Sequence, residues 1–236
     1  MPIDTTMDKN PFAAGRRTRR GVIGIEAAIV LIAFVIVAAA LSFVVLNAGF
    51  TTTQQAKTTV SQGLQTSSSV LAVSGTVVGH VNGTSSSIDV VTLPLRVASG
   101  SNNVDLQHSL VAVKYFSKTR SYDNIYAGTL ETKKYASVSD ALADAVTASL
   151  IDHNPLASSG AATPTNSTAI IYWTVNENNN KVLDKSENAI LAIAFNSADR
   201  PTQLDTVKIE VSPSIGAPLT VERNIPTLTN TFTDLS

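Results

Sequence analysis

The sequence has no cysteine and few charged side chains, and these two absences narrow the classes of protein it can belong to. None of its 236 residues is a cysteine, which excludes disulfide scaffolds, thiolate metal sites and cysteine nucleophiles. Only 15% of the residues are charged, and the formal net charge is −1. Because a nucleic-acid-binding protein normally carries a basic face or tail, no nucleic-acid partner is expected.

The sequence also lacks the short motifs of common enzymes. His80, His108 and His153 are far apart and form no HExxH pair. The stretch Gly21–Gly24 lacks the GK[ST] ending of a phosphate-binding loop, and there is no GxSxG turn. We therefore predict that the protein is not an enzyme and requires no cofactor.

The apolar residues are concentrated in one segment near the N-terminus. Every residue from Ala27 to Leu41 is apolar, and no charged residue occurs from Ala27 to Ala56. As a helix with a rise of about 1.5 Å per residue, Val22–Leu46 would be roughly 37 Å long, enough to cross a hydrocarbon layer of about 30 Å. The segment therefore predicts a helix that can span a membrane.

Residues 1–21 form a basic leader before this span. They hold five basic and two acidic residues, so the leader carries +3 and the remainder −4. The arginines at 16, 17, 19 and 20 are expected to keep this end on the cytoplasmic side of a membrane. A secretory signal peptide would have a shorter apolar region of roughly 7 to 15 residues, whereas composition leaves an uncleaved signal anchor open.

The junction between leader and span carries a resemblance to a known family. The string RRGVIGIE, from Arg19 to Glu26, resembles the class III signal of type IV pilin-like proteins, which are cut after a glycine, here between Gly21 and Val22. The longer stretch from Gly21 to Phe50 is similar to the N-terminus of archaellins, the archaeal flagellins. Many archaellins have glycine where this chain has Glu26, which pilins also carry. Later strings, such as Leu95–Ser101 and Gly216–Arg223, are similar to archaellin blocks too.

This resemblance implies a structural subunit of the archaeal flagellum filament, used for swimming. It implies self-assembly into an open helical homopolymer, processing by a prepilin-like signal peptidase, and membrane assembly and motor machinery with a separate ATPase. The precursor would insert transiently in the cytoplasmic membrane, and the product would be an extracellular filament. Two alternatives stay open: a subunit of a non-rotating adhesive pilus, and a membrane-anchored binding or hydrolase domain.

Glu26 places a carboxylate inside an otherwise apolar helix, where it is expensive unless it has a partner. Cleavage after Gly21 would create an α-amino group at Val22, about one helical turn away. Pairing with that amine, in its own or a neighbouring copy, would set the axial register of a helix bundle. The alternative is a carboxylate that stays hydrated near the membrane interface.

The remaining pattern predicts an α+β fold. A long hydrophobic and then amphipathic α-helix is expected over residues 22–73, on the order of 75 Å in length, forming the filament core. Residues 74–236 are expected to form an outer, Ig-like antiparallel β-sandwich. Its eight predicted strands are 75–81, 88–98, 109–117, 124–132, 169–175, 189–195, 206–212 and 219–223. One amphipathic helix is predicted at Val138–Leu150.

Residues 176–187 match the oxygen spacing of a 12-residue calcium loop. The expected ligands are Asn176, Asn178, Asn180, the carbonyl of Val182, Asp184 and a bidentate Glu187. Lys181 replaces the usual glycine, and three ligands are neutral amides. The two readings left open are a site for Ca²⁺ or another divalent cation, and an asparagine-rich hairpin with side-chain-capped turns.

Asn82 and Asn166 begin N-glycosylation sequons, Asn82-Gly83-Thr84 and Asn166-Ser167-Thr168. Both are predicted to lie in surface loops. Since archaellins are commonly glycosylated, the resemblance implies that at least one of them is modified.

Overall fold

The computed structural model describes residues 19–68, 70–81, 86–158 and 161–235. The leader residues before position 19 and the predicted sequon at Asn82 lie outside the described residues. The chain divides into two units, residues 1–60 and 61–236.

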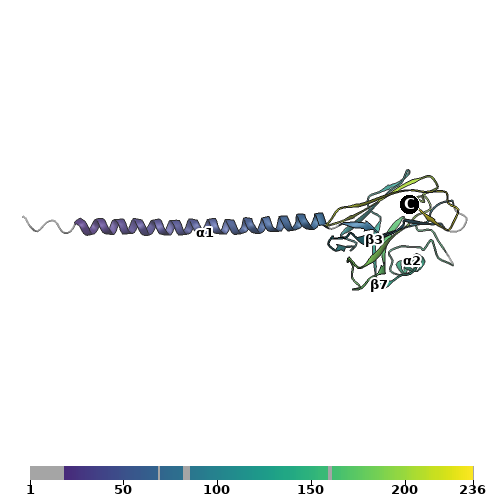
Figure 1. Cartoon of the computed structure of the whole chain (residues 1–236), viewed down its shortest axis with the longest axis horizontal. Helices are drawn as coiled ribbons and strands as arrows, with labels where there is room; N and C mark the ends of the chain where they lie inside the picture. Colours follow the sequence, from purple (N-terminus) through teal and green to yellow (C-terminus); the bar gives the residue numbers. More distant parts are fainter. Residues whose placement is uncertain (1–18, 69, 82–85, 159–160, 236) are drawn as a thin grey trace, which may run out of the picture. The chain divides into compact units, whose positions relative to one another are not determined.

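The first unit contains most of one long helix, α1. Helix α1 runs from Arg19 to Ser68 without interruption, through Gly49 and Gly63 (Figure 1). Of the described residues, one stretch is long and apolar enough to span a membrane, Gly24–Leu64. Its side chains are exposed along its whole length.

The predicted end of this helix at Val73 is wrong, because α1 ends at Ser68 and Leu71–Val73 form strand β1. Strand β1 pairs antiparallel with Leu95–Val97, and the amide of Ala98 donates to the carbonyl of Val70 at 2.9 Å. Sheet pairing therefore overrides the helical spacing of apolar residues that the sequence shows there.

The second unit contains two main sheets and a two-stranded ribbon. The larger sheet has the order β13-β2-β3-β10-β8-β7, with β1 also paired to β3; the second has the order β12-β11-β5-β6; the ribbon is β4-β9. The strands are β2 Val78–His80, β3 Val90–Val97, β4 Val104–Asp105, β5 Val111–Phe116, β6 Ser121–Tyr122, β7 Tyr126–Lys134, β8 Thr168–Val175, β9 Val182–Leu183, β10 Asn188–Ala194, β11 Thr206–Pro213, β12 Leu219–Asn224 and β13 Phe232–Asp234.

The core lies between the two main sheets, as in a sandwich. Trp173 of β8 is fully buried there together with Tyr115 of β5. Tyr115 packs against Phe195, with 5.0 Å between the ring centroids. On the other face of the larger sheet, Tyr172 packs with Leu142 of the second helix in a separate cluster. Strand β8 is thus covered on both faces, which explains its continuous apolar run.

That second helix, α2, covers Val138–Thr147 and explains why one pair of strands runs parallel. Strands β7 and β8 pair parallel, and α2 lies between them in the sequence and beside β7 in space (Figure 1). Parallel neighbours need a crossover connection, usually a helix. Ser137 caps α2, its side chain accepting from the amide of Ser139 at 3.2 Å. The predicted fold class is confirmed: a long apolar helix is followed by a mostly antiparallel β-domain.

Candidate assembly site

The exposed apolar surface of α1 is the most unusual feature of the molecule. Phe34 is 76% exposed, and Val45 and Phe43 are exposed to a similar extent. Soluble proteins rarely leave a contiguous apolar surface of this size in water. The surface therefore requires an apolar environment, which a bilayer or copies of the same helix can provide.

Glu26 lies in this apolar stretch and is exposed. It borders a shallow groove on the helix, together with Ala27, Val30, Leu31 and Phe34. Toward the C-terminal end of α1, the next charged residue is Lys57, about 46 Å away along the helix axis at 1.5 Å per residue. Glu26 therefore has no oppositely charged partner on the described part of its own helix between these two positions.

The predicted cleavage site, between Gly21 and Val22, falls in the first turn of α1, which begins at Arg19. Helix ends fray readily, so this bond lies where the helix opens at the smallest energetic cost.

The polar part of α1 holds a set of hydrogen bonds that sequence reasoning missed. Between residues 51 and 59, each threonine hydroxyl bonds a carbonyl of its own helix, one turn earlier: Thr52 to Ala48 at 2.8 Å and Thr59 to Gln55 at 2.9 Å, for example. Thr51, Thr53 and Thr58 do the same. The runs of threonine directly after an apolar helix were the available signal, because such hydroxyls can bond back to the preceding turn.

The asparagine-rich loop is organised by its own side chains. The Oδ1 of Asn176 accepts from the amide of Asn179 at 2.8 Å, that of Asn178 from the amide of Asn180 at 3.2 Å, and that of Asn180 from the amide of Val182 at 2.7 Å. These hydrogen bonds form the side-chain-capped turns expected of an asparagine-rich hairpin. Each carboxamide oxygen keeps a second lone pair, which a hard cation can use.

Glu187 closes the loop from inside. It is only 1% exposed, and its carboxylate accepts from the amides of Glu177 at 2.8 Å and Asp184 at 3.1 Å. Asp184 in turn accepts from the side chain of Asn178. Of the predicted side-chain ligands, the structure thus joins Asn178 to Asp184, while Asn176, Asn180 and Glu187 bond backbone amides of the loop, and no group of three or more His, Asp or Glu side chains in the described residues could hold a metal ion.

The loop turns at a different residue from the one that the calcium-loop pattern predicts. The residue with a left-handed backbone is Asn179, at φ 53°, rather than Lys181. Asparagine tolerates this conformation better than other non-glycine residues, so no glycine is needed at 181. Leu183 is fully buried and pairs in the ribbon with Val104, which anchors the loop to the core.

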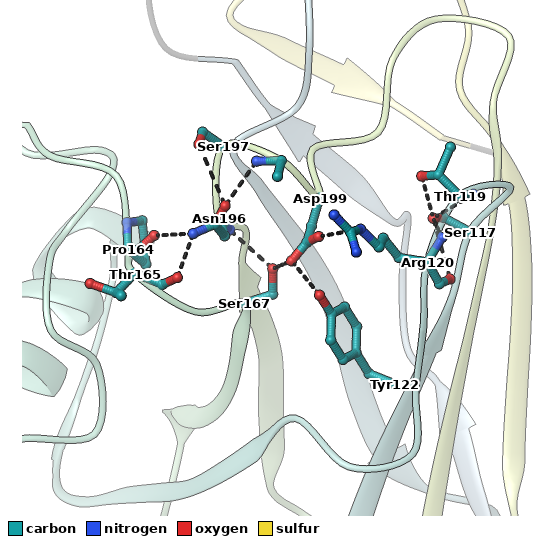
Figure 2. A network of polar contacts seen from close by, with 11 residues as sticks. Ser117, Thr119, Arg120, Tyr122, Pro164, Thr165, Ser167, Asn196, Ser197 and Asp199 are labelled. Atoms are coloured by element: carbon teal, nitrogen blue, oxygen red, sulfur yellow. Dashed lines mark hydrogen bonds and ion pairs between the residues drawn. The ribbon is translucent and has the colours of Figure 1, made fainter.

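The second predicted sequon lies beside a buried carboxylate. Asp199 is 6% exposed and accepts from the hydroxyls of Ser167 at 2.7 Å and Tyr122 at 2.9 Å, and it pairs with Nε of Arg120 at 3.3 Å (Figure 2). The hydrogen bond to Asp199 raises the pKa of Tyr122. Asn166, the first residue of the sequon, directly precedes Ser167 and is exposed. The network therefore holds the sequon against the domain and leaves Asn166 on the surface.

The same loop is held a second time by Asn196. Its side-chain amide donates to the carbonyls of Pro164, at 3.1 Å, and Thr165, and its backbone amide donates to Ser167 at 3.0 Å (Figure 2). Sequence reasoning found the sequon but not Asp199 or Asn196, because these come from a loop about 30 residues later in the chain.

The matches to known proteins extend over both the helix α1 and the outer domain. The sequence model of the family described as Archaeal-type flagellin matches residues 21–223. A relative described as "Probable flagellin 1" from Aeropyrum pernix is 38% identical over 213 residues, covering 89% of this chain and 94% of that protein. "Probable flagellin 2" from Archaeoglobus fulgidus is 30% identical, covering 94% of this chain and 95% of that protein.

Two solved structures share the fold. The archaeal flagellum of Methanospirillum hungatei strain JF1 covers 86% of this chain and 93% of its own, with a TM-score of 0.58 at 22% identity. The crystal structure of archaeal flagellin FlaB1 from Methanocaldococcus jannaschii covers 71% and 96%, with a TM-score of 0.55 at 19% identity. These findings favour the flagellin reading over an adhesive pilus subunit. On the extent of the match to the family model and to the Aeropyrum pernix relative, the chain belongs to the archaeal-type flagellin family.

Proposed function

We propose that the chain is a structural filament subunit that polymerises through α1, as the core of an extracellular filament that drives swimming. The observation that carries this is the exposed, almost uncharged stretch Gly24–Leu64, joined in one chain to a domain with its own buried core. Contacts between copies that do not close into a ring produce an open helical polymer.

The experiment is complementation of a strain that lacks its own filament subunit. Expression of this chain should restore filaments that can be sheared from the cells, and swimming with them. Filaments without swimming would support a static function, and a chain that stays in membranes as a monomer would contradict assembly.

We propose further that a prepilin-like peptidase cuts between Gly21 and Val22 before assembly. The leader would otherwise carry its +3 charge into an apolar core at a heavy desolvation cost. The family match begins at residue 21, which supports this site. Edman sequencing of sheared filaments should begin at Val22, and Gly21→Leu should leave the uncut precursor in the membrane fraction. Normal filaments from Gly21→Leu would rule out the assignment.

The new amine at Val22 gives Glu26 its proposed partner in a neighbouring copy, with the pair setting axial register. Glu26→Gln keeps the shape and removes the charge, so it should reduce filament yield while leaving cleavage unchanged. Equal yields from Glu26→Gln and the wild type would favour a hydrated carboxylate with no assembly role.

Assembly and rotation would come from separate membrane machinery with its own ATPase, because the sequence contains no nucleotide-binding motif. A pull-down from detergent-solubilised membranes with the wild-type chain tests this partnership, and the Gly21→Leu precursor, which should stay in the membrane before assembly, provides the control.

The loop from Asn176 to Glu187 favours a second, stabilising function in binding Ca²⁺ or a similar divalent cation. Two of its expected ligands, Asp184 and Glu187, are carboxylates, and side-chain hydrogen bonds already form its turns. Chelation by EGTA should lower the melting temperature of purified filaments, and added Ca²⁺ should restore it. Glu187→Gln should abolish the response, and an unchanged melting temperature in EGTA would leave the loop as a capped hairpin.

Asn166 is proposed as a glycosylated position because it is exposed at the end of a fixed loop. Intact-mass measurement of filament subunits, compared with Asn166→Gln and Asn82→Gln variants, assigns the occupied sequon directly.

A further inference from the structure

Between Asn47 and Thr59, α1 carries uncharged polar side chains on one face. Helix geometry advances about 100° per residue, and Asn47, Thr51, Gln54 and Thr58 follow each other at spacings of four, three and four residues. A shallow groove along the helix is lined by Thr51, Gln54, Gln55, Thr58 and Thr59. We call Asn47, Thr51, Gln54, Gln55, Thr58 and Thr59 the amide face.

The amide face contains no charge, although it is polar. The single charged residue between Ala27 and Leu64 is Lys57, which lies about 120° around the helix from Thr51. A helix face in contact with water usually carries charged side chains, whereas charged residues are depleted in the cores of interfaces. Lys57 lies about 160° around the helix from Gln55 and Thr59 but only about 60° from Gln54, so Gln54 is at the edge of the amide face and water lies beyond that edge.

The threonines of this face need no outside partner. The hydroxyls of Thr51, Thr58 and Thr59 donate to carbonyls of α1 at 2.9, 3.0 and 2.9 Å. Burying them leaves no unpaired donor, so the remaining demand for hydrogen bonds comes from the carboxamides of Asn47, Gln54 and Gln55.

The side of α1 that carries the amide face also carries Glu26 in the apolar part of the helix. Glu26 precedes Asn47 by 21 residues, which at about 100° per residue places the two within about 60° of each other around the axis. Polar residues in an apolar helix face neighbouring helices rather than lipid. Glu26 and the amide face therefore mark one side of α1 as the side that other helices cover.

We propose that the amide face is buried against α1 of a second copy in the filament, where the carboxamides of Asn47, Gln54 and Gln55 pair with those of the neighbour. A carboxamide both donates and accepts, so identical copies satisfy one another. Such pairs also fix register, as a single buried asparagine does between coiled-coil helices. The inference rests on the proposed filament function and adds the face and the chemistry of the contact.

The test is Gln55→Glu, which adds a charge with almost no change of shape, away from Lys57, in cells whose filaments consist of this subunit. A carboxylate buried against a second helix should lower the yield of sheared filaments about tenfold or more. The matched control is Gln203→Glu, the same change at an exposed position of the outer domain. An immunoblot of membranes should find Gln55→Glu cleaved and stable, which separates assembly from folding and processing.

A second variant, Gln55→Leu, distinguishes a buried amide pair from a solvated surface. Filaments should form but dissociate at a lower temperature than wild type, because the amide of the neighbour is left unpaired. Thr58→Val, on the same face, should dissociate near the wild-type temperature because its hydroxyl bonds only its own helix. Normal yield from Gln55→Glu, or unchanged or greater stability from Gln55→Leu, would overturn the inference. Loss of filaments in the wild type and Gln203→Glu alike would instead contradict the filament function itself.

Discussion

The two units of this chain use apolar residues in opposite ways. In the outer domain, residues such as Trp173 and Leu191 are fully buried in a core that one copy completes alone. In α1, residues such as Phe34 and Leu46 are as apolar but exposed. The core of the outer domain is therefore formed within one copy, whereas the apolar environment of α1 must be provided by lipid or by other copies.

The same contrast holds for polar groups. In the outer domain, a buried polar group can be satisfied by residues distant in the sequence, as Asp199 is by Tyr122. In α1, hydroxyls are satisfied by the preceding turn of the same helix, as Thr53 is by Gly49 at 2.8 Å. A helix that satisfies its own hydroxyls can move from one apolar environment to another without breaking those hydrogen bonds.

The largest expected effect comes from separating the two units. A chain of residues 61–236 retains the sheets and their core, so it should be folded, soluble and monomeric. Sedimentation velocity and circular dichroism measure this. Filaments formed by the shortened chain would show that assembly does not depend on α1.

Trp173→Ala should destabilise the outer domain by about 3–5 kcal/mol, because it removes a fully buried aromatic side chain. The matched change in α1, Val60→Ala, removes a 61% exposed side chain and should leave the free energy of unfolding of the outer domain unchanged. Urea unfolding of both variants can be followed by circular dichroism. Tryptophan fluorescence can also be used for Val60→Ala, because that variant keeps Trp173. Comparable losses in the two variants would contradict the separation of the units.

Acid should weaken the outer domain through His80. Burial lowers the pKa of His80 from 6.5 to about 4, so the unfolded chain binds a proton on it more readily than the folded domain does. Stability is therefore full above pH 6.5 and falls as the pH drops toward 4, by on the order of 3 kcal/mol. Thermal unfolding of residues 61–236 between pH 7 and pH 4 should show this slope in wild type.

The same pH series on variants assigns the slope. His80→Gln should flatten it, and His153→Gln, at a half-exposed histidine, should retain it. An identical slope in His80→Gln would assign the acid sensitivity to other groups.

Asp199→Asn should have a smaller effect, about 1–3 kcal/mol, because the residue keeps its shape but loses the charge that Arg120, Tyr122 and Ser167 share. Asp123→Asn, at an exposed position, provides the matched control. Denaturant unfolding measures both, and equal stability of the two variants would show that the network of Figure 2 contributes nothing to folding.

Much of this fold could be predicted from sequence, and the misses share a physical cause. All eight predicted strands exist, because β-branched runs bounded by turn residues are strong local signals. Strands of two or three residues, such as β4 and β13, were missed because their pairing partners define them rather than their own composition. The parallel pairing of β7 and β8 was missed for the same reason.

The residues of the candidate sites also fall into those that the sequence predicts and those that only the fold brings together. Glu26 and the loop closed by Glu187 could be found from residue type and spacing alone. The left-handed residue of that loop, Asn179, could not, since the calcium-loop pattern suggested position 181. The buried network of Asp199 is invisible to sequence reasoning because it joins three loops that only the folded sandwich brings together.

Backbone hydrogen exchange of sheared filaments, before and after their dissociation, tests the central claim most directly. If copies complete the environment of α1, peptides from Gly24 to Val60 should exchange slowly in filaments and much faster after dissociation, while peptides containing Trp173 should change little. Equal exchange of the α1 peptides in both states would contradict the claim that α1 is buried among copies.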